Sequence, residues 1–528
     1  MTGSLIVASN YPTPVVVGKD YTDFILTPLY SRMGQEEAVA NIPIDSKVFW
    51  DKCIKYKNRL NNYRHLGWIV LLASAINVIL IGGKRRAFGI FVTALHNDFK
   101  NTSMTELNWI GDSYAAVGFF LMPFMTTLIV QVGRAYRFAM MAAGAFIFVS
   151  CFTSAAVPSP GYLFATHTVL HGIGSTLILC TTALITGEYF DKKHRFHVLA
   201  TAFVSGGPYG VLIFGPLFSI WIHNYGWRHA FEICGVVFLG FTLLAAVVYQ
   251  AKSNDNYEEV DNNSQKGTME SVEPTAASGR GWALISLSHL RKNLQIVLWA
   301  LDRLVHNFVM YGLLMNMTTY VTEALKDRIE QGSRVNLYFG IGESLIFTAG
   351  ALVGDRMRGY LPLFYMIGAA SAAIILLIMQ SIYKNVKGVL TLAGFLGAAV
   401  GTGNTFLYAT SEEVMLIHGS VAFPMTKMIA GIGMLLAPFL SGTVIDTFSF
   451  RGYFISMAVL VCIRVIFFII ICIILWRKKK SLNRKRQQEA EAEATKLQPK
   501  IITTAPSSEG PDNESDACTT NHGSMALQ

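Results

Sequence analysis

The sequence predicts an all-α membrane protein, with about twelve transmembrane helices in two six-helix halves. Three observations predict this fold class. Apolar residues make up 52% of the chain and charged residues only 15%, whereas a soluble globular protein carries about 25% charged residues. Apolar runs long enough to cross a bilayer recur along the chain between short polar loops. A long polar stretch from Lys252 to Gly279 divides these runs into two sets.

The individual spans follow from run length, because a helix needs about 20 apolar residues to cross the bilayer core. In chain order the runs cover residues 67–95, 109–132, 137–157, 161–187, 197–222, 229–250, 294–322, 335–354, 360–381, 388–410, 415–443 and 453–476. The predicted domains are a tail (1–66), a first six-helix half (67–250), a linker (251–293), a second half (294–476) and a tail (477–528). The polar composition of the last tail predicts disorder.

Basic residues indicate the orientation of the spans. They gather in the loops and ends that fall on one side: Lys52, Lys55, Lys57, Arg59, Arg64, Arg134, Arg137, Lys192, Lys193, Arg195, Arg356, Arg358 and Lys478 to Lys480. By the positive-inside rule this side is cytoplasmic, so both termini are expected there, in a multi-pass protein of the plasma membrane. The net charge of +9 is then explained by the loop residues that orient the protein in the membrane. No nucleic-acid partner is expected, because the sequence has no basic helix and no set of strands with interleaved aromatic residues.

The sequence gives little support for an enzyme or for a metal site. The seven cysteines are odd in number and form no C-x-x-C pair, so neither a disulfide framework nor a zinc site is implied. Neither H-E-x-x-H nor a nucleophile-elbow motif occurs, and we expect no enzyme, no catalytic residues and no cofactor. His167 and His171 have the spacing of two metal ligands on a helix, but no third ligand accompanies them. A polar pair between helices is the expected arrangement.

Two loops carry residues suited to gating. The hinge from Tyr189 to Arg195 contains Lys192 and Lys193, and the loop from Gly350 to Gly359 contains Asp355 and Arg356. A glycine-rich turn with Asp and Arg at a helix junction suits a charge latch that closes between the halves in one access state. A related loop, Gly133 to Arg137, occurs in the first half, where ordinary positive-inside loops explain its arginines equally well.

Charged residues inside spans are costly in lipid and are functional candidates by default. Arg86 is the first, because its planar guanidinium can hold a carboxylate through two hydrogen bonds. The alternative is that the first helix leaves the lipid near Gly83, with Lys84, Arg85 and Arg86 reaching to the outer interface.

The seventh span offers a second group of candidates. Asp302 and His306 are four residues apart and share a helix face, so Asp302 can orient His306, while Arg303 is expected to point elsewhere. These charges can instead belong to an amphipathic segment near the surface. Glu343 lies deeper in an apolar run, as a proton carrier or as a partner of Arg86 or Arg303. Asn404 follows a glycine pair and is expected beside substrate, although close packing also explains the glycines.

The stretch from Gly172 to Arg228 resembles the monocarboxylate transporter family of the major facilitator superfamily. The run Gly172 to Phe190 matches the family's fourth span, Lys192-Lys193 its basic pair, and Tyr225 to Arg228 the start of its sixth span. Ser205-Gly206-Gly207-Pro208 and Gly67-Trp68 are also similar to family elements. The likeness is clearest over 67–250 and weaker over 290–475. It implies alternating access, a monocarboxylate or related small organic anion as substrate, protons as a coupling ion and a single-span accessory glycoprotein.

Gapless counting from Gly67 places Arg86 on the family's substrate-binding lysine. In the eighth span, Glu343 stands where proton-coupled members have Asp, but Phe347 occupies the position of their Arg. The resemblance therefore leaves three functions open. They are a proton-coupled monocarboxylate transporter, a facilitative carrier for aromatic or amino-acid-like carboxylates, and a sensor or scaffold that binds without transport.

Overall fold

The fold is described from a computed structural model, which describes residues 66–100, 102, 104–205, 208–250, 293–321, 329–382 and 385–497. The predicted tail up to residue 65, the linker up to residue 292, the Gly206-Gly207 pair and the chain beyond Leu497 lie outside the described residues. Within these ranges the chain is helical and contains no strand, which confirms the predicted fold class.

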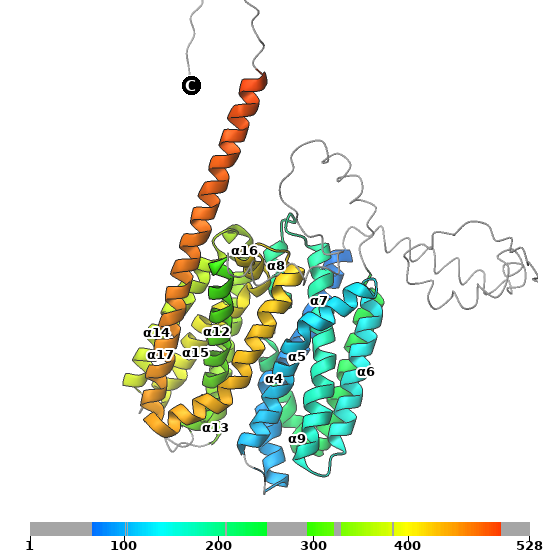
Figure 1. Ribbon diagram of the computed structural model, residues 1–528. Helices are drawn as coiled ribbons and strands as arrows, with labels where there is room; N and C mark the ends of the chain where they lie inside the picture. Colours follow the sequence, from blue (N-terminus) through cyan, green and yellow to red (C-terminus); the bar gives the residue numbers. More distant parts are fainter. Residues whose placement is uncertain are drawn as a thin grey trace, which may run out of the picture. The chain divides into compact units, whose positions relative to one another are not determined.

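We call residues 66–250 the first half. Its elements are α4 (Leu66–Asp98), α5 (Met104–Gln131), α6 (Tyr136–Ala155), the 3-10 turn η1 (Pro160–Tyr162), the π-helix η2 (Phe164–His171), α7 (Gly172–Tyr189), α8 (His197–Ser205) and α9 (Gly210–Val248). We call residues 293–475 the second half. Its elements are α12 (Leu294–Thr319), α13 (Ile329–Val353), η5 (Gly354–Met357), α14 (Leu361–Ser381), α15 (Val386–Thr405), α16 (Leu407–Met415) and α17 (Gly419–Leu497) up to Leu475. Figure 1 shows the two halves side by side.

Residues up to Leu475 form one compact unit, and a second unit begins at Trp476. The described part of the second unit is helical as far as Leu497, where disorder was predicted. Its run of Lys, Arg, Gln, Glu and Ala explains the difference, because these residues have high helix propensity.

Ten segments of the described chain are long and apolar enough to cross a membrane, compared with about twelve expected. One reason is that α9 contains two of the expected spans, since the chain turns at Gly226 within it. The other is that α12 has 26 residues but carries Asp302, Arg303 and His306, which lower its apolar content. With α8 and the start of α9 together forming the fifth span, the described helices match the predicted order.

The turn at Gly226 explains the Tyr225 to Arg228 motif. Gly226 has φ 80° and ψ 163°, a conformation that a side chain would strain. The indole N–H of Trp227 then donates to Asp98 at the end of α4, at 2.5 Å. Arg228 donates to the carbonyl oxygens of Ala155 and Val157 after α6, at 2.7 and 3.1 Å. The motif thus joins the ends of three helices.

Small residues let the helices of the first half approach closely, as expected for packing in lipid. A Cβ on Gly83 of α4 would lie 2.7 Å from the carbonyl oxygen of Gly210 in α9. Likewise, a Cβ on Gly174 of α7 would lie 3.0 Å from the carbonyl oxygen of Ala143 in α6. Side chains at these positions would push the helices apart.

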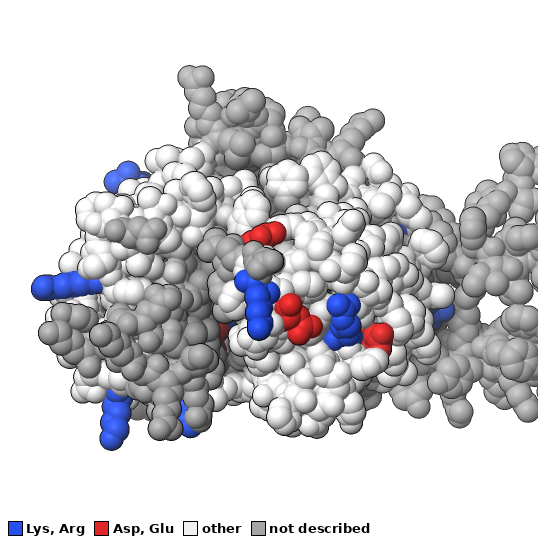
Figure 2. Space-filling model, turned by 90° about the horizontal axis from the view of Figure 1, so that it is seen from below, with Lys and Arg blue, Asp and Glu red and all other residues white. Residues whose placement is uncertain are grey.

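Figure 2 shows the end of the molecule opposite the one where α8 and α16 lie in Figure 1. Its described surface is mostly uncharged, with a small group of basic and acidic side chains near the middle of the view. The hinge that contains Lys192 contacts α16 through Glu412 and therefore lies at the other end.

Candidate functional site

Arg86 and Glu343 form an ion pair between the two halves. Nη2 of Arg86 in α4 donates to Oε1 of Glu343 in α13 at 2.6 Å, and the two side chains are only 7% and 3% exposed. The helix α4 continues for 33 residues to Asp98, so the first span does not end near Gly83. Arg86 therefore lies inside a spanning helix and contacts the opposite half, rather than reaching to an interface.

Two further cations surround this pair. The guanidinium of Arg85 lies over the ring of Phe119, 5.4 Å from its centroid, and over Tyr311 at 5.7 Å. Nζ of Lys427 in α17 approaches the same Phe119 ring at 4.8 Å. The charges of Arg85, Arg303, Arg86 and Glu343 all act on Lys427. We call Arg85, Arg86, Glu343 and Lys427 the central site, and its three cations outnumber its one carboxylate.

The central site has hydrogen-bond donors to spare. Nε and Nη1 of Arg86 and Nε of Arg85 are buried and have no hydrogen-bond partner among the described residues. Since buried polar groups in proteins are normally satisfied, unused guanidinium donors next to a surplus of positive charge indicate a place for an anion. An oxygen-rich anionic group fits these donors best.

Asp302 lies in a second buried charge cluster, inside the second half. It bonds Arg303, the adjacent residue, and accepts from Nε of Arg464 in α17 at 2.8 Å. All three side chains are 3% exposed or less. The expectation that Asp302 orients His306 and that Arg303 points elsewhere is wrong, because two arginines already occupy the carboxylate. Arg464 is also buried in this cluster rather than facing the lipid or a partner.

The remaining bonds of Arg303 hold it in place. It donates to the carbonyl oxygen of Gly403 in α15, and its guanidinium stacks on Trp299 and Tyr365, 4.4 and 5.0 Å from their ring centroids. Each of its three nitrogens therefore has an acceptor among the described residues.

His306 and Asn404 lie next to this cluster. His306 is fully buried, and its ring approaches Gly403, while Asn404 donates to the sulfur of Met310 at 3.1 Å. Neither residue contacts Arg86 in the described structure. The close approach at Gly403 supports the packing explanation for the glycine pair around Asn404.

Aromatic side chains line the contact between the halves beside the central site. Phe347 lies four residues after Glu343 and packs edge-on against Phe203 of α8 and Tyr209, at 6.1 and 5.6 Å. The hydroxyl of Tyr209 bonds Thr348 at 2.7 Å. An aromatic surface therefore occupies the position at which the family resemblance predicts a second arginine.

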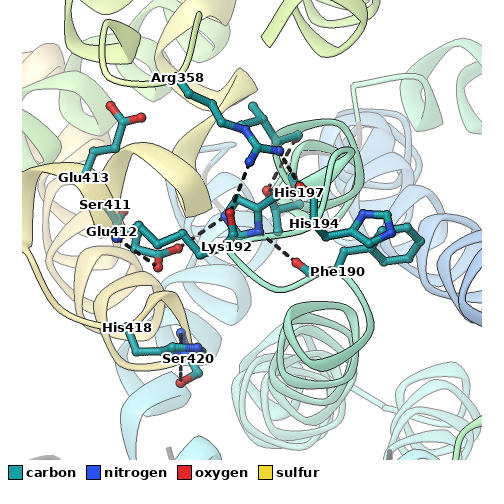
Figure 3. A network of polar contacts seen from close by, with 12 residues as sticks. Phe190, Lys192, His194, His197, Arg358, Ser411, Glu412, Glu413, His418 and Ser420 are labelled. Atoms are coloured by element: carbon teal, nitrogen blue, oxygen red, sulfur yellow. Dashed lines mark hydrogen bonds and ion pairs between the residues drawn. The ribbon is translucent and has the colours of Figure 1, made fainter. Parts of the chain in front are cut away.

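At the end where α8 and α16 lie, charged and polar groups join the halves (Figure 3). Glu412 of α16 lies 3.7 Å from Nζ of Lys192 and 3.3 Å from Nε2 of His197. Asp355 of η5 accepts from the backbone N–H groups of Val198 and Leu199 in α8, at 3.0 and 3.2 Å. We call Lys192, His197, Asp355, Arg358 and Glu412 the inter-half latch.

Arg358 makes the most contacts of the latch. It donates to the carbonyl oxygens of Lys192, His194 and Arg195 at 3.1, 2.6 and 3.0 Å, and pairs with Asp355 at 2.5 Å. The prediction had placed this role on Arg356, which is exposed. Lys193 is exposed as well. A 3-10 helix has three residues per turn, so Asp355 and Arg358 lie on the same side of η5 and Arg356 does not.

The related loop of the first half makes contacts only within that half. Arg134 pairs with Glu188 at 3.2 Å, and Arg137 donates to the carbonyl oxygen of Tyr249 at 2.8 Å. Of the two loops with similar sequences, only the second therefore bridges the halves through the contacts described here.

The carboxylates of α16 respond differently to their surroundings. Burial raises the pKa of Glu412, but the hydrogen bond and charge of His197 and the charge of Lys192 outweigh it, so the pKa lies below its usual value. Burial raises the pKa of Glu413, although the N–H of Gly359 donates to it at 2.7 Å. Because the pKa of Glu412 is lowered in the closed state, its stabilising contribution is present above the usual carboxyl pKa and is lost only as pH falls through the lowered value.

Replacing Arg358 with alanine is expected to loosen the latch, since it removes every contact of Arg358 with the hinge. A reporter cysteine at Thr348 in a variant whose seven native cysteines are replaced, treated with a membrane-impermeant maleimide, measures access from the latch end. We expect its labelling rate to rise about tenfold, the effect of about 1.4 kcal/mol. The Arg356→Ala variant is the matched control and should label like the parent. Equal rates in the two variants would contradict the assigned role of Arg358.

Several of these residues were missed in the sequence. Glu412 and Arg358 lie in predicted loops, where charges are common, whereas Lys427 lies in the middle of the predicted span 415–443 and was overlooked there. Arg85 was recognised only as part of a basic run. The helical register was a usable signal for Arg85, because successive residues of a spanning helix face different sides and Arg85 and Arg86 therefore point in different directions.

The family described as Major Facilitator Superfamily matches residues 70–423. The chain is 28% identical to mouse (Mus musculus) monocarboxylate transporter 6 over 189 residues, 36% of this chain and 39% of that protein. It is 26% identical to human (Homo sapiens) monocarboxylate transporter 14 over 219 residues, 40% of this chain and 42% of that protein. For rat (Rattus norvegicus) monocarboxylate transporter 2 the identity is 28% over 177 residues, 33% of this chain and 34% of that protein. The matches thus span about two fifths or less of each relative.

Proposed function

Since the chain belongs to the major facilitator superfamily, whose members are membrane transporters rather than enzymes, we propose that it moves a monocarboxylate or related small organic anion across the membrane by alternating access. The observation that carries this proposal is the surplus of buried positive charge at the central site. A carboxylate that leaves water loses its hydration, and buried guanidinium donors can replace it. The names of the similar transporters support the same substrate class.

In the proposed cycle the anion competes with Glu343 for Arg86. Arg86 holds Glu343 through one nitrogen and has two others without a partner. An incoming carboxylate binds these donors and weakens the contact with Glu343, which is the contact that joins α4 to α13. Substrate binding thereby loosens the attachment between the halves at the point where it is bound.

The inter-half latch supplies the second element of alternating access. In the described conformation it closes one end, which we assign to the cytoplasmic side together with both termini, in the plasma membrane. Release toward that side requires Arg358 and Glu412 to part from the hinge. The second half moves as a unit, because Asp302 forms ion pairs with Arg303 and Arg464 that hold α12 against α17.

The lining favours anions with an apolar body. Phe119 and Tyr311 lie against Arg85, and Phe347 lies one helical turn from Glu343. The second candidate function, facilitative transport of aromatic or amino-acid-like carboxylates, is favoured by Phe347 at the position of the expected arginine. A single-span accessory glycoprotein and the domain boundaries given above belong to the same proposal.

The test is uptake by the purified full-length protein in proteoliposomes. Radiolabelled lactate, pyruvate, benzoate, phenylpyruvate and tryptophan are supplied at equal pH and with an imposed pH gradient. Uptake or exchange of at least one carboxylate supports transport, and the preferred compound separates the two candidate functions. Binding of a compound without any uptake or exchange would instead favour a sensor or scaffold.

A further inference from the structure

A second buried cation lies in the first half, on the same helix as Arg86 but away from the central site. Lys84 of α4 is fully buried. Its Nζ lies 3.2 and 3.3 Å from the two ring nitrogens of His171 in η2, and 3.8 Å from the sulfur of Cys151 in α6. The rings of Tyr114 and Phe231 lie 6.0 and 5.5 Å away. No carboxylate pairs with Lys84 in the part of the chain that the structure describes.

His167 extends this cluster by one helical turn. Its ring stacks on that of His171, with centroids 5.3 Å apart and planes inclined by 6°. Both of its ring nitrogens are buried, and neither has a hydrogen-bond partner among the described residues. Both histidines lie in the π-helix η2, and π-helical turns occur often at functional sites. Among the described residues no group of three metal ligands is present, so a metal does not explain the pair.

Among the described residues, the titratable groups that face the cluster are Tyr114 from α5, Cys151 from α6 and Cys234 from α9, with Lys84 itself on α4. The rings of Phe88, Phe231 and Phe238 also pack against the two histidines. Lys84 is the charge that acts on His167, and Lys84 and His167 are those that act on His171. Lys84 is therefore the charged group that acts on both histidines.

From this geometry we propose that Lys84, His171 and His167 form a proton-binding site. With the proton bound, the ammonium of Lys84 donates to a neutral imidazole nitrogen of His171, and the cluster carries one positive charge. When the proton leaves to water, an amine and two neutral imidazoles remain, and no buried charge is left. A buried ammonium without a carboxylate partner is costly, and this cost favours the neutral cluster. The cluster can therefore hold its proton in one arrangement of the helices and release it to water when the helices open.

This inference rests on the proposed function, because it assigns the coupling ion of the same transporter. Lys84 and Arg86 are two residues apart on α4, and about 200° around the helix axis. Lys84 therefore faces the interior of the first half while Arg86 faces Glu343. A change of charge at Lys84 alters how α4 packs against η2, and the same helix carries the anion-binding arginines. Proton binding and anion binding are thus coupled through α4. This coupling does not need the arginine that proton-coupled members of the family have at the position of Phe347.

The experiment compares two modes of transport of each of the five labelled compounds by the full-length protein in proteoliposomes, after subtraction of the entry into protein-free liposomes. Exchange at equal internal and external pH measures anion binding and the conformational change. Uptake driven by an inside-alkaline gradient of one pH unit measures proton coupling, and trapped pyranine reports the entry of protons. In the wild type we expect the gradient to raise accumulation up to about tenfold, the limit for one proton per anion at this gradient.

The variants His171→Gln and Lys84→Met should lose the gradient stimulation and the pyranine signal. Their rate of anion exchange at equal pH should fall much less than their gradient-driven uptake. Lys84→Arg keeps a cation that cannot release its proton and should also be uncoupled. His306→Gln, a buried histidine of the second half, and His223→Gln, an exposed one, are matched controls that should keep the stimulation.

The other outcomes separate failure of the proton site from failure of the proposed function. If His171→Gln keeps the wild-type stimulation, or the wild type exchanges anions but ignores the gradient, the proton site is overturned and anion transport stands. If His306→Gln alone uncouples, the proton site belongs to the second half. If the wild type exchanges none of the five labelled compounds, the proposed function itself fails, and the proton assignment fails with it.

Discussion

Replacing Arg86 with methionine is expected to reduce initial carboxylate uptake by at least about 100-fold, which corresponds to about 2.7 kcal/mol. The change removes the guanidinium that holds Glu343 and carries two unused donors. It also leaves Glu343 as a buried carboxylate beside an apolar side chain. The measurement is the initial rate of uptake of the preferred labelled compound, normalised to the amount of reconstituted protein.

Three variants make this result interpretable. Arg451→Met removes an exposed arginine of α17 and should leave uptake within about twofold, as surface changes usually do. Glu343→Gln frees Arg86 without removing it, and should keep anion binding while weakening the contact between the halves. Arg86→Lys keeps the charge but not the planar donors, and should raise KM more than it lowers kcat. Wild-type uptake in Arg86→Met would show that the anion binds elsewhere.

Replacing Asp302 with asparagine is expected to be the most damaging single change to stability. Asp302 is the carboxylate for both Arg303 and Arg464, all within the interior of the second half. Breaking a buried ion pair by removing one partner typically lowers the free energy of unfolding by about 3–5 kcal/mol, because the other charge stays buried. We expect poor yield and a lower midpoint of thermal unfolding of the purified protein in detergent.

The double variant Asp302→Asn with Arg464→Met tests this reason. It removes one of the two stranded cations and should recover part of the lost stability, so that the two changes are not additive. Glu232→Gln is the matched control, since Glu232 is 38% exposed and pairs with the exposed His229. A midpoint for Asp302→Asn equal to that of Glu232→Gln would contradict a stabilising role for the cluster.

The architecture was predictable because lipid leaves few options. Each span must be long and apolar, and the polar stretch between the sixth and seventh runs separates the halves. The difference between ten and about twelve spans has local causes, namely the turn at Gly226 and the charges of α12. The apolar runs predicted both of these spans. The count of ten merges the first into α9, which is helical on both sides of Gly226, and omits the second because the charges of α12 lower its apolar content.

The partners of the charged residues were harder to predict. Chemistry identified Arg86 and Glu343 as buried groups in need of partners, and the structure places them together across 257 residues of sequence. The same argument failed for Asp302, because helical spacing pointed to His306 while Arg464 lies 162 residues away. Local spacing describes one helix face, whereas the neighbour that reaches that face depends on how all the helices pack. Arg358 was overlooked for a similar reason, since the hinge carbonyl groups that it contacts lie 163 to 166 residues away in the sequence.

The contact between Asp355 and α8 has a consequence for the speed of opening. Val198 and Leu199 are in the first turn of α8, where backbone N–H groups have no partner within the helix. Asp355 thus acts as an N-terminal cap supplied by the other half of the protein. When the halves part, α8 loses its cap at a typical cost of about 0.5–2 kcal/mol. Water can bond the exposed amides at once, so this contact prolongs the closed state without preventing it from opening.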